Sequence, residues 1–244
     1  MSVTAETLKK LALFDTPTIC NVIEVFEVRP QNTGYMDARI QAAFPDMGPM
    51  VGFAATASFR SDALPGTGDV YGSLADQAEL FATLDGPAVV VFQDVDDPSV
   101  AATFGEVMCS TYKAFGAAGL ITSGSGRDLD QVRDIQFPVF TGSTNCSHGY
   151  SHMLHIGVSV RVGGLTLQTG ELLHGDLNGV TQIPLDIAAE IADVTPDFIK
   201  AEGHVLSYVQ SPGEKKPDEL RERMALMRGD IGKLRQQCSR AKPG

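Results

Sequence analysis

The stretch from Gly105 to Asp128 constrains the fold of this chain most strongly, because it alternates between helix-forming and strand-forming residues. A β-branched apolar run at 88–92 precedes it and is typical of a buried strand. Residues 106–115 have the pattern of a short helix ended by glycines, and a second apolar run follows at 120–122. A strand, a helix and a strand in this order predict a right-handed βαβ unit and hence a parallel sheet.

The lengths of these segments bring both ends of the unit to one edge of the predicted sheet. A helix of ten residues spans about 15 Å, and a strand of five residues returns about 16 Å. Glu106 and the Arg127-Asp128 pair should therefore meet at the carboxyl edge, where open α/β sheets bind ligands. The free N–H groups at the start of the helix would favour an anion there. A solvated ion pair after a glycine-rich turn is the alternative that the spacing alone leaves open.

Glu106, twenty intervening residues and Arg127-Asp128 resemble the signature of RraA-like proteins, which is an acidic residue or Gly, the same interval and Arg-Asp. The similarity extends over roughly residues 8–205. It is carried further by FPVF at 137–140, VGGLTL at 162–167, GELLHGDLNGV at 170–180 and Ile183-Pro184. The resemblance implies an α/β fold of the swivelling β/β/α type. The family includes the 4-hydroxy-4-methyl-2-oxoglutarate aldolases, which are class II, metal-dependent pyruvate aldolases.

The resemblance also implies a role for each residue of this group. Asp128 would bind Mg²⁺ (or Mn²⁺) directly, and Glu106 would act through a water bound to the metal. Arg127 would pair with the carboxylate or the enolate oxygen of the substrate, so we expect Arg127, Asp128 and Glu106 to be the catalytic residues. The same substrate carboxylate would be held at the start of the helix, by Gly105, Val107 and Met108.

These roles imply a divalent-metal-dependent carbon–carbon lyase that acts on small 2-oxo acids. Retro-aldol cleavage of 4-hydroxy-2-oxo acids and decarboxylation of oxaloacetate pass through the same metal-stabilised pyruvate enolate, so one site could perform both. The alternative within the family is a non-catalytic regulator that binds a protein partner such as a ribonuclease. Those regulators tend to carry Gly where this chain has Glu106. Because the family's sites lie between subunits, the resemblance also implies a homotrimer or a dimer of trimers.

Two further acidic residues stand at positions that the family uses. Asp69 follows a Pro-Gly turn near the substrate in RraA-like proteins, although Val70 stands here where Asn is usual, and a plain turn is the alternative. Glu202 stands where the aldolases place an acidic residue that reaches the metal of a neighbouring subunit. An exposed helical Glu is the alternative at that position.

The segment 141–156 is rich in Gly and Ser and carries three histidines beside a cysteine. Such clustering suggests zinc, but no fourth ligand is obvious, so we favour a polar loop at the mouth of the site. Many family members carry an Arg or Lys soon after the strand at 137–140, and this chain has neither between 134 and 160. We therefore expect His148 and His152 to take part in substrate choice. The full cluster is Cys146, His148, His152 and His155.

The remaining segments complete a two-part organisation, with an α/β domain at 1–210 and a C-terminal helical extension at 211–244. Within the first part the patterns predict a helix with Thr16 as its N-cap, a half-buried strand at 53–59, a helix capped by Ser73, and two helices at 185–194 and 196–209. In the second part a heptad seam predicts one long helix from Pro217, docked on its own chain or on another subunit. The seam is Leu220, Met224, Met227, Ile231, Leu234 and Cys238.

Charge and cysteine usage narrow the partners and the compartment. The formal net charge of -11 argues against nucleic acid, because phosphate binding needs basic patches. The four cysteines form no CxxC motif, which favours free thiols in a reducing cytoplasm. The polar N-terminus lacks the apolar core of a signal peptide, and no apolar run approaches the ~20 residues of a membrane helix. We therefore expect a cytoplasmic protein with no membrane partner.

Overall fold

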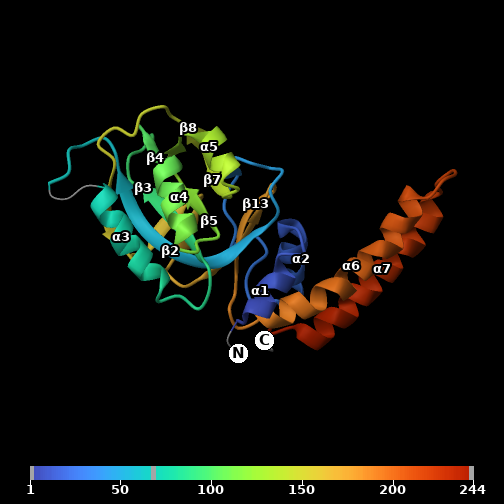
Figure 1. The fold of residues 1–244 in the computed structure, drawn as a ribbon. Coiled ribbons are helices and arrows are strands. Elements are labelled where there is room, and N and C mark those ends of the chain that lie inside the picture. The colour runs from blue at the N-terminus through green and yellow to red at the C-terminus, as the bar shows by residue number, and fades with distance from the viewer. Residues whose placement is uncertain (1–2, 67–69, 242–244) are drawn as a thin grey trace.

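The structure, a computed structural model, describes residues 3–66 and 70–241, with residues 70–72 described as backbone only. Helices and strands alternate through most of the chain, as the sequence predicts (Figure 1). In chain order the elements are α1 (Ala5–Leu11), α2 (Thr16–Phe26), β1 (Gln41–Ala42), β2 (Met50–Arg60), α3 (Val70–Phe81), β3 (Ala88–Asp94), β4 (Ala102–Phe104), α4 (Glu106–Ala114), β5 (Gly119–Thr122), β6 (Ser125–Gly126), α5 (Leu129–Asp134), β7 (Val139–Thr141), β8 (Ser143–Thr144), β9 (His152–Ile156), β10 (Val160–Val162), β11 (Leu165–Leu167), β12 (Leu172–Asp176), β13 (Gly179–Ile183), α6 (Ala188–Gln210) and α7 (Pro217–Cys238).

The main sheet has a parallel centre and antiparallel additions. Its order is β1-β7-β5-β3-β2-β12-β13, and β9 pairs with the end of β2 beyond β12. The neighbours β2, β3, β5 and β7 run parallel, which agrees with the βαβ unit predicted around α4. The mixed α/β architecture and the C-terminal helices agree with the predicted fold class. None of the helices in the described residues is long and apolar enough to cross a membrane.

Strand β2 is buried along nearly its whole length, so the prediction of a half-buried strand at 53–59 is wrong. Every residue of β2 before Arg60 is buried. Ala55 and Phe59 pack in a cluster with residues of α3 and α4, whereas Ala54 packs in another with residues of β10 and β11. Because both faces of the strand are covered, neither face needs polar residues, and the sequence does not alternate as it would beside water.

A second, smaller sheet extends the main one. Its three strands, β4, β6 and β8, run parallel. Along the chain, β3 leads to β4, β5 leads to β6, and β7 leads to β8, so each short strand follows a strand of the main sheet. The sequence analysis did not predict this sheet. Its carboxyl ends are the starting points of α4, of α5 and of the loop after β8.

The starts of two helices differ from the prediction. The N-cap of α2 is Asp15 and not Thr16, because Asp15 Oδ1 accepts a hydrogen bond from the Thr18 N–H at 2.8 Å. Helix α3 already begins at Val70, so Ser73 lies inside its first turns and is not its N-cap.

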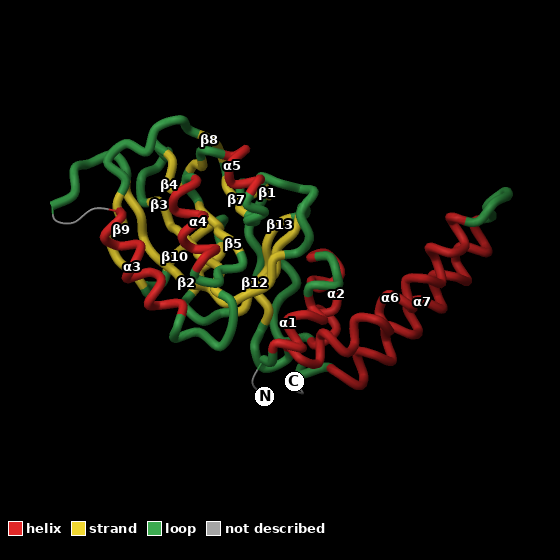
Figure 2. The backbone as a smooth tube through the Cα atoms, in the orientation of Figure 1, coloured by secondary structure: helices red, strands yellow, loops and turns green. Residues whose placement is uncertain are grey.

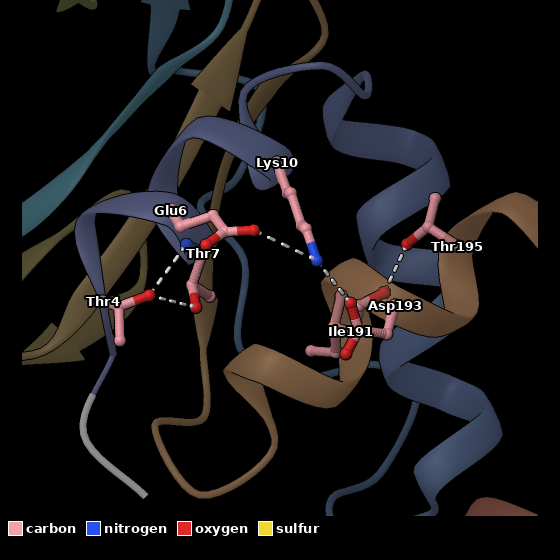
Figure 3. Close-up of polar contacts among 7 residues, drawn as sticks. All are labelled: Thr4, Glu6, Thr7, Lys10, Ile191, Asp193 and Thr195. Atoms are coloured by element: carbon pink, nitrogen blue, oxygen red, sulfur yellow. Dashed lines mark hydrogen bonds and ion pairs between the residues drawn. The ribbon is translucent and has the colours of Figure 1, made fainter.

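Helix α6 runs without a break from Ala188 to Gln210, whereas the sequence predicted two helices with a stop at Pro196. Proline lacks the N–H that would bond to the carbonyl four residues earlier. Just before the proline, the Thr195 hydroxyl donates a hydrogen bond to the Ile191 carbonyl, four residues earlier, at 2.7 Å. Figure 3 shows this contact. Ile191 and Phe198, on either side of the proline, are both buried in the cluster formed with α1 and α2. Tertiary packing therefore outweighs the local stop signal.

Helix α1 is joined to α6 by a surface contact. Lys10 Nζ lies 2.9 Å from Asp193 Oδ1 (Figure 3), and Thr4 caps α1 by accepting a hydrogen bond from the Thr7 N–H at 3.1 Å. An exposed ion pair of this kind contributes little to stability, because water screens the two charges. The apolar residues beneath it, Leu8 and Leu11, therefore carry most of the attachment.

Helix α7 packs back along α6, and the two form a hairpin that projects from the α/β body (Figures 1 and 2). Near the body the heptad seam is covered, since Cys238 is buried and Ile231 and Leu234 pack on the cluster of α1, α2 and α6. Toward the tip Met224 is 37% exposed. The seam thus docks on its own chain at the base of the hairpin and is open at the tip.

A buried polar network ties β12 to the N-terminal helices. His174 is fully buried, with Nδ1 2.9 Å from the Thr16 hydroxyl and Nε2 3.2 Å from the Leu11 carbonyl oxygen. Asp176 Oδ2 accepts a hydrogen bond from the Thr16 N–H at 2.8 Å. The Asp176 carboxylate therefore holds the start of α2.

The buried histidine should make stability depend on pH. Burial lowers the pKa of His174 below its ordinary value of 6.5. The unfolded chain therefore binds a proton that the folded chain does not, so the free energy of unfolding should fall as the pH decreases below about 6.5. His174→Gln removes this group. The free energy of unfolding of the variant should therefore change less between about pH 7 and pH 5 than that of the wild-type protein. Urea unfolding at a series of pH values measures both, and equal slopes in the two proteins would contradict the assignment.

Candidate active site

The carboxyl ends of the small sheet bring three separate segments together. Strand β4 is followed by Gly105 and α4, and β6 is followed by Arg127 and Asp128. Strand β8 is followed by a loop that begins with Asn145. The Arg127 N–H donates to the Phe104 carbonyl at 3.2 Å, and the Asn145 N–H donates to the Gly126 carbonyl at 3.0 Å. Parallel pairing thus places the acidic, basic and loop residues at one edge.

Asp128 is the central residue of this edge. It is the N-cap of α5 and has a left-handed backbone (φ 54°), a conformation that Asp adopts more readily than most residues. Its Oδ2 accepts a hydrogen bond from the Glu106 N–H at 3.0 Å and lies 3.7 Å from Arg127 Nε. One carboxylate therefore caps the positive end of α4 and also orients the guanidinium.

Gly105 is required by this close approach. A Cβ at Gly105 would lie 2.5 Å from Asp128 Oδ2 and 3.0 Å from Arg127 Nε, closer than side chains tolerate. Glycine at the N-cap of α4 therefore lets the carboxylate reach the Glu106 N–H.

These residues border a cavity of about 260 Å³. Its charged lining residues are Arg127 and Asp128, and Gly105 lies between them and α4. The loop after β8 contributes His148 and Ser151. Thr103 also borders the cavity, but its hydroxyl is buried and hydrogen-bonded to Thr122 and Ser125. Most of the remaining wall is apolar or aromatic: Pro65, Ala102, Phe104, Val107, Met108 and Tyr150.

The structure brings some predicted site residues to the cavity and leaves others outside it. Gly105, Val107, Met108, Arg127, Asp128 and His148 line it. The Glu106 backbone is part of the site, but its side chain is exposed and is not among the lining residues. His152 is buried in β9, with Nδ1 2.7 Å from the Tyr150 carbonyl oxygen, and so contacts the loop and not the cavity. Asp69 lies outside the described residues.

Glu202 is not brought to the cavity within the chain. It lies on α6, close to Asp15 at the start of α2. Burial and the negative charge of Asp15 raise the pKa of Glu202. Helix α6 belongs to the hairpin and not to the edge formed by α4 and α5 (Figure 1). A role for Glu202 at a metal, which the resemblance implies for a neighbouring subunit, stays a prediction.

The donor groups at the cavity suit a hard cation better than zinc. The described residues contain no group of three or more His, Cys, Asp or Glu side chains that could hold a metal, so Cys146 and the three nearby histidines do not gather around one point. Mg²⁺ differs because it keeps several waters and needs only one or two protein carboxylates. Asp128, with Glu106 next to it at the rim, fits that requirement.

The thiol and the phenol on the buried face of α4 are not ionised. Cys109 and Tyr112 are fully buried. Burial raises the pKa of the Cys109 thiol, to which the charge of Asp128 adds, and burial also raises the pKa of the Tyr112 hydroxyl. Both groups therefore stay protonated at neutral pH.

Sequence reasoning missed Phe104, Tyr150 and Pro65 as wall residues. The signal for Phe104 was present in the apolar run Ala101-Ala102-Thr103-Phe104, which ends directly before Gly105. Tyr150 had no comparable signal, because its place depends on the path of a loop. Its N–H donates to the Ser61 carbonyl at 2.9 Å, a contact between segments far apart in the sequence.

The contact at Gly105 can be tested by stability. Gly105→Ala should displace the Asp128 carboxylate from the Glu106 N–H and lower the free energy of unfolding by about 1–3 kcal/mol. Gly48→Ala is the matched control, because nothing lies within 4 Å of the added Cβ. Urea unfolding compares the two variants. A Gly105→Ala protein as stable as the Gly48→Ala protein would show that the close approach does not occur.

Comparisons with known proteins agree on a family. A family model described as Aldolase/RraA (RraA-like) matches residues 16–181, well over half of the chain. A Halalkalibacterium halodurans protein provisionally named 4-hydroxy-4-methyl-2-oxoglutarate aldolase is 30% identical over 99 residues, which is 40% of this chain and 47% of that protein. The chain spans about half or less of the length of the curated relatives that it matches.

Solved structures share the fold at low sequence identity. An uncharacterised protein of Pseudomonas syringae pv. tomato has a TM-score of 0.70 and 19% identity, covering 92% of this chain and 95% of that one. RraAS2 of Streptomyces coelicolor, described as an unusual member of the RNase ES inhibitor RraA protein family, has a TM-score of 0.65 and 21% identity, covering 83% and 96%. The structures share the fold, and the family match over residues 16–181 shows that the chain belongs to the RraA-like family.

Proposed function

We propose that this chain is a divalent-metal-dependent carbon–carbon lyase that acts on small 2-oxo acids. The observation that carries the proposal is the pairing of Arg127 with Asp128 against the start of α4, at the wall of a small cavity. The provisional name of the Halalkalibacterium halodurans relative supports the same reaction class. A volume of about 260 Å³ suits a small substrate, because sites for drug-sized ligands measure roughly 300–1,000 Å³.

Arg127 would bind the carboxylate and the 2-oxo oxygen of the substrate. Its guanidinium presents donors in a planar fork that matches such oxygens, and Asp128 fixes its direction from 3.7 Å away. The first-turn N–H groups of Val107 and Met108 have no partners within the helix by its geometry and would complete the anion site. The substrate would thus be held with its oxygens toward the start of α4.

Asp128, and Glu106 beside it, would hold Mg²⁺ or Mn²⁺. When bound, such an ion supplies a Lewis acid next to the 2-oxo group. Arg127 complements it by stabilising negative charge on the same oxygen as the reaction proceeds, and a preorganised charge of this kind typically lowers a barrier by ~3 kcal/mol.

The proposed cleavage is a retro-aldol reaction. The C4 hydroxyl loses its proton to a water molecule, the C3–C4 bond breaks, and its electron pair passes to C3 to form the enolate of pyruvate. Protonation at C3 gives pyruvate, and C4 leaves as the carbonyl carbon of an aldehyde or ketone. Decarboxylation of oxaloacetate gives the same enolate by loss of CO₂, so it belongs to the same proposal.

The proposal includes an assembly and a compartment. A homotrimer, or a dimer of trimers, would let Glu202 of one subunit approach the site of another, which its place on α6 prevents within one chain. All four cysteines are free, which suits a reducing cytoplasm.

Variants of the pair test the proposal. Arg127→Ala and Asp128→Ala should each lower kcat/KM for pyruvate release from 4-hydroxy-2-oxo acids by at least about a hundredfold. The assay is run with Mg²⁺ and with EDTA, and EDTA should abolish turnover. Arg133→Ala and Asp130→Ala on α5 are the controls, because neither residue lines the cavity, and both should keep wild-type rates.

Wild-type rates in Arg127→Ala or Asp128→Ala would remove this mechanism. Absence of turnover in the wild-type protein, with every substrate and metal, would favour the non-catalytic regulator instead. Circular dichroism of each variant shows whether a lost rate reflects a lost fold.

A further inference from the structure

The cavity has a charge inventory that restricts the substrate. Among its described lining residues Arg127 is the one permanent cation and Asp128 is the one carboxylate, so the pair carries no net charge. The Glu106 side chain is exposed and does not line the cavity, and it adds a further negative charge next to the pair. With the divalent cation of the proposed function bound, Arg127 and the ion would carry one more positive charge than Asp128 and Glu106 carry negative charges. One substrate carboxylate brings the site to neutrality, and a second one would face an environment with no spare positive charge.

Cations on the neighbouring elements are held elsewhere. Arg60 at the end of β2 pairs with Asp96, at 3.5 Å between Nε and Oδ1. Lys113 on α4 bonds to the Gln136 carbonyl at 3.3 Å, and Arg133 on α5 lies over the Phe44 ring at 5.2 Å from its centroid. None of these three side chains lines the cavity. The chain also has no Lys or Arg between Asp134 and Val160, which includes the whole loop after β8.

The rest of the cavity wall is largely apolar and aromatic. Phe104, Val107 and Met108 come from the end of β4 and the start of α4, and Tyr150 comes from the loop after β8. The loop is anchored, since the Tyr150 N–H bonds to the Ser61 carbonyl and the Tyr150 carbonyl lies 2.7 Å from His152 Nδ1. A distal carboxylate against this wall would lose hydration without gaining a partner, whereas an alkyl group would be favoured.

We infer that the preferred substrate is a 4-hydroxy-2-oxo acid with one carboxylate and a small uncharged group at C4, so that cleavage gives pyruvate and a neutral aldehyde or ketone. This rests on the proposed lyase function and narrows it. Dicarboxylates, including 4-hydroxy-2-oxoglutarates and oxaloacetate, become the poorer substrates. The residues that set this preference are those of the apolar wall and His148. His148 lines the cavity at a position where an Arg or Lys would supply a positive charge for a second carboxylate.

A matched pair of substrates tests the inference. 4-Hydroxy-2-oxopentanoate and 4-hydroxy-2-oxoglutarate differ by a methyl group in place of the distal carboxylate. With Mg²⁺ present, kcat/KM for pyruvate release should be at least about tenfold higher for the pentanoate, because the cavity leaves the second carboxylate unpaired. Equal values, or a higher value for the glutarate, would overturn the inference while leaving the lyase function intact.

A binding measurement keeps the inference testable if neither compound is cleaved. In that case the lyase proposal fails, and calorimetry with 2-oxopentanoate and 2-oxoglutarate, in the presence of Mg²⁺, still compares one and two carboxylates. Binding of 2-oxopentanoate at least about tenfold tighter supports the assigned charge inventory. Equal or tighter binding of 2-oxoglutarate refutes it.

A variant at the cavity mouth should reverse the preference. His148→Arg adds a guanidinium that can pair with a distal carboxylate, so the ratio of kcat/KM for the glutarate over the pentanoate should rise by about tenfold. His148→Gln adds no charge and should keep the monocarboxylate preference. An unchanged ratio in His148→Arg, with unchanged circular dichroism, would show that the distal group does not lie near this wall.

Discussion

The hydrogen bond from the Glu106 N–H to the Asp128 carboxylate is the interaction on which the site depends. It joins two loops that follow different strands, and it places a negative charge where the N–H groups of α4 are unpaired. Three local features make it possible: Gly105 has no side chain to obstruct it, Asp128 adopts a left-handed backbone, and the Arg127 N–H is fixed to the Phe104 carbonyl.

The cavity arises because the chain repeats one simple arrangement. Strands β3, β5 and β7 of the main sheet each lead to a short strand, and the short strands pair in parallel in their own sheet. This second sheet moves the carboxyl edge away from the buried centre and toward solvent. The central strands β2 and β3 can then be largely apolar, while the charged pair of the cavity lies at the ends of the small sheet.

Much of this site was predictable because its residues are local in sequence or repeat at strand and helix spacing. The βαβ unit around α4 and the meeting of Glu106 with Arg127 and Asp128 followed from the strand and helix patterns together with the segment lengths. The small sheet was missed because β6 and β8 have two residues each, too few for a periodic signal. The continuous helix α6 was missed because proline is a strong local stop signal, while the burial of Ile191 and Phe198 that opposes it is tertiary.

The hairpin of α6 and α7 has both of its ends at the body and its bend far from it (Figure 1). The Arg240 N–H donates to the Phe26 carbonyl at 2.7 Å, and the Arg240 guanidinium bonds to both oxygens of Glu190. The segment just after α7 therefore fastens the end of α2 to the start of α6. A peptide inserted at the exposed bend, residues 211–214, would leave these contacts in place. Truncation before Arg240 would remove them.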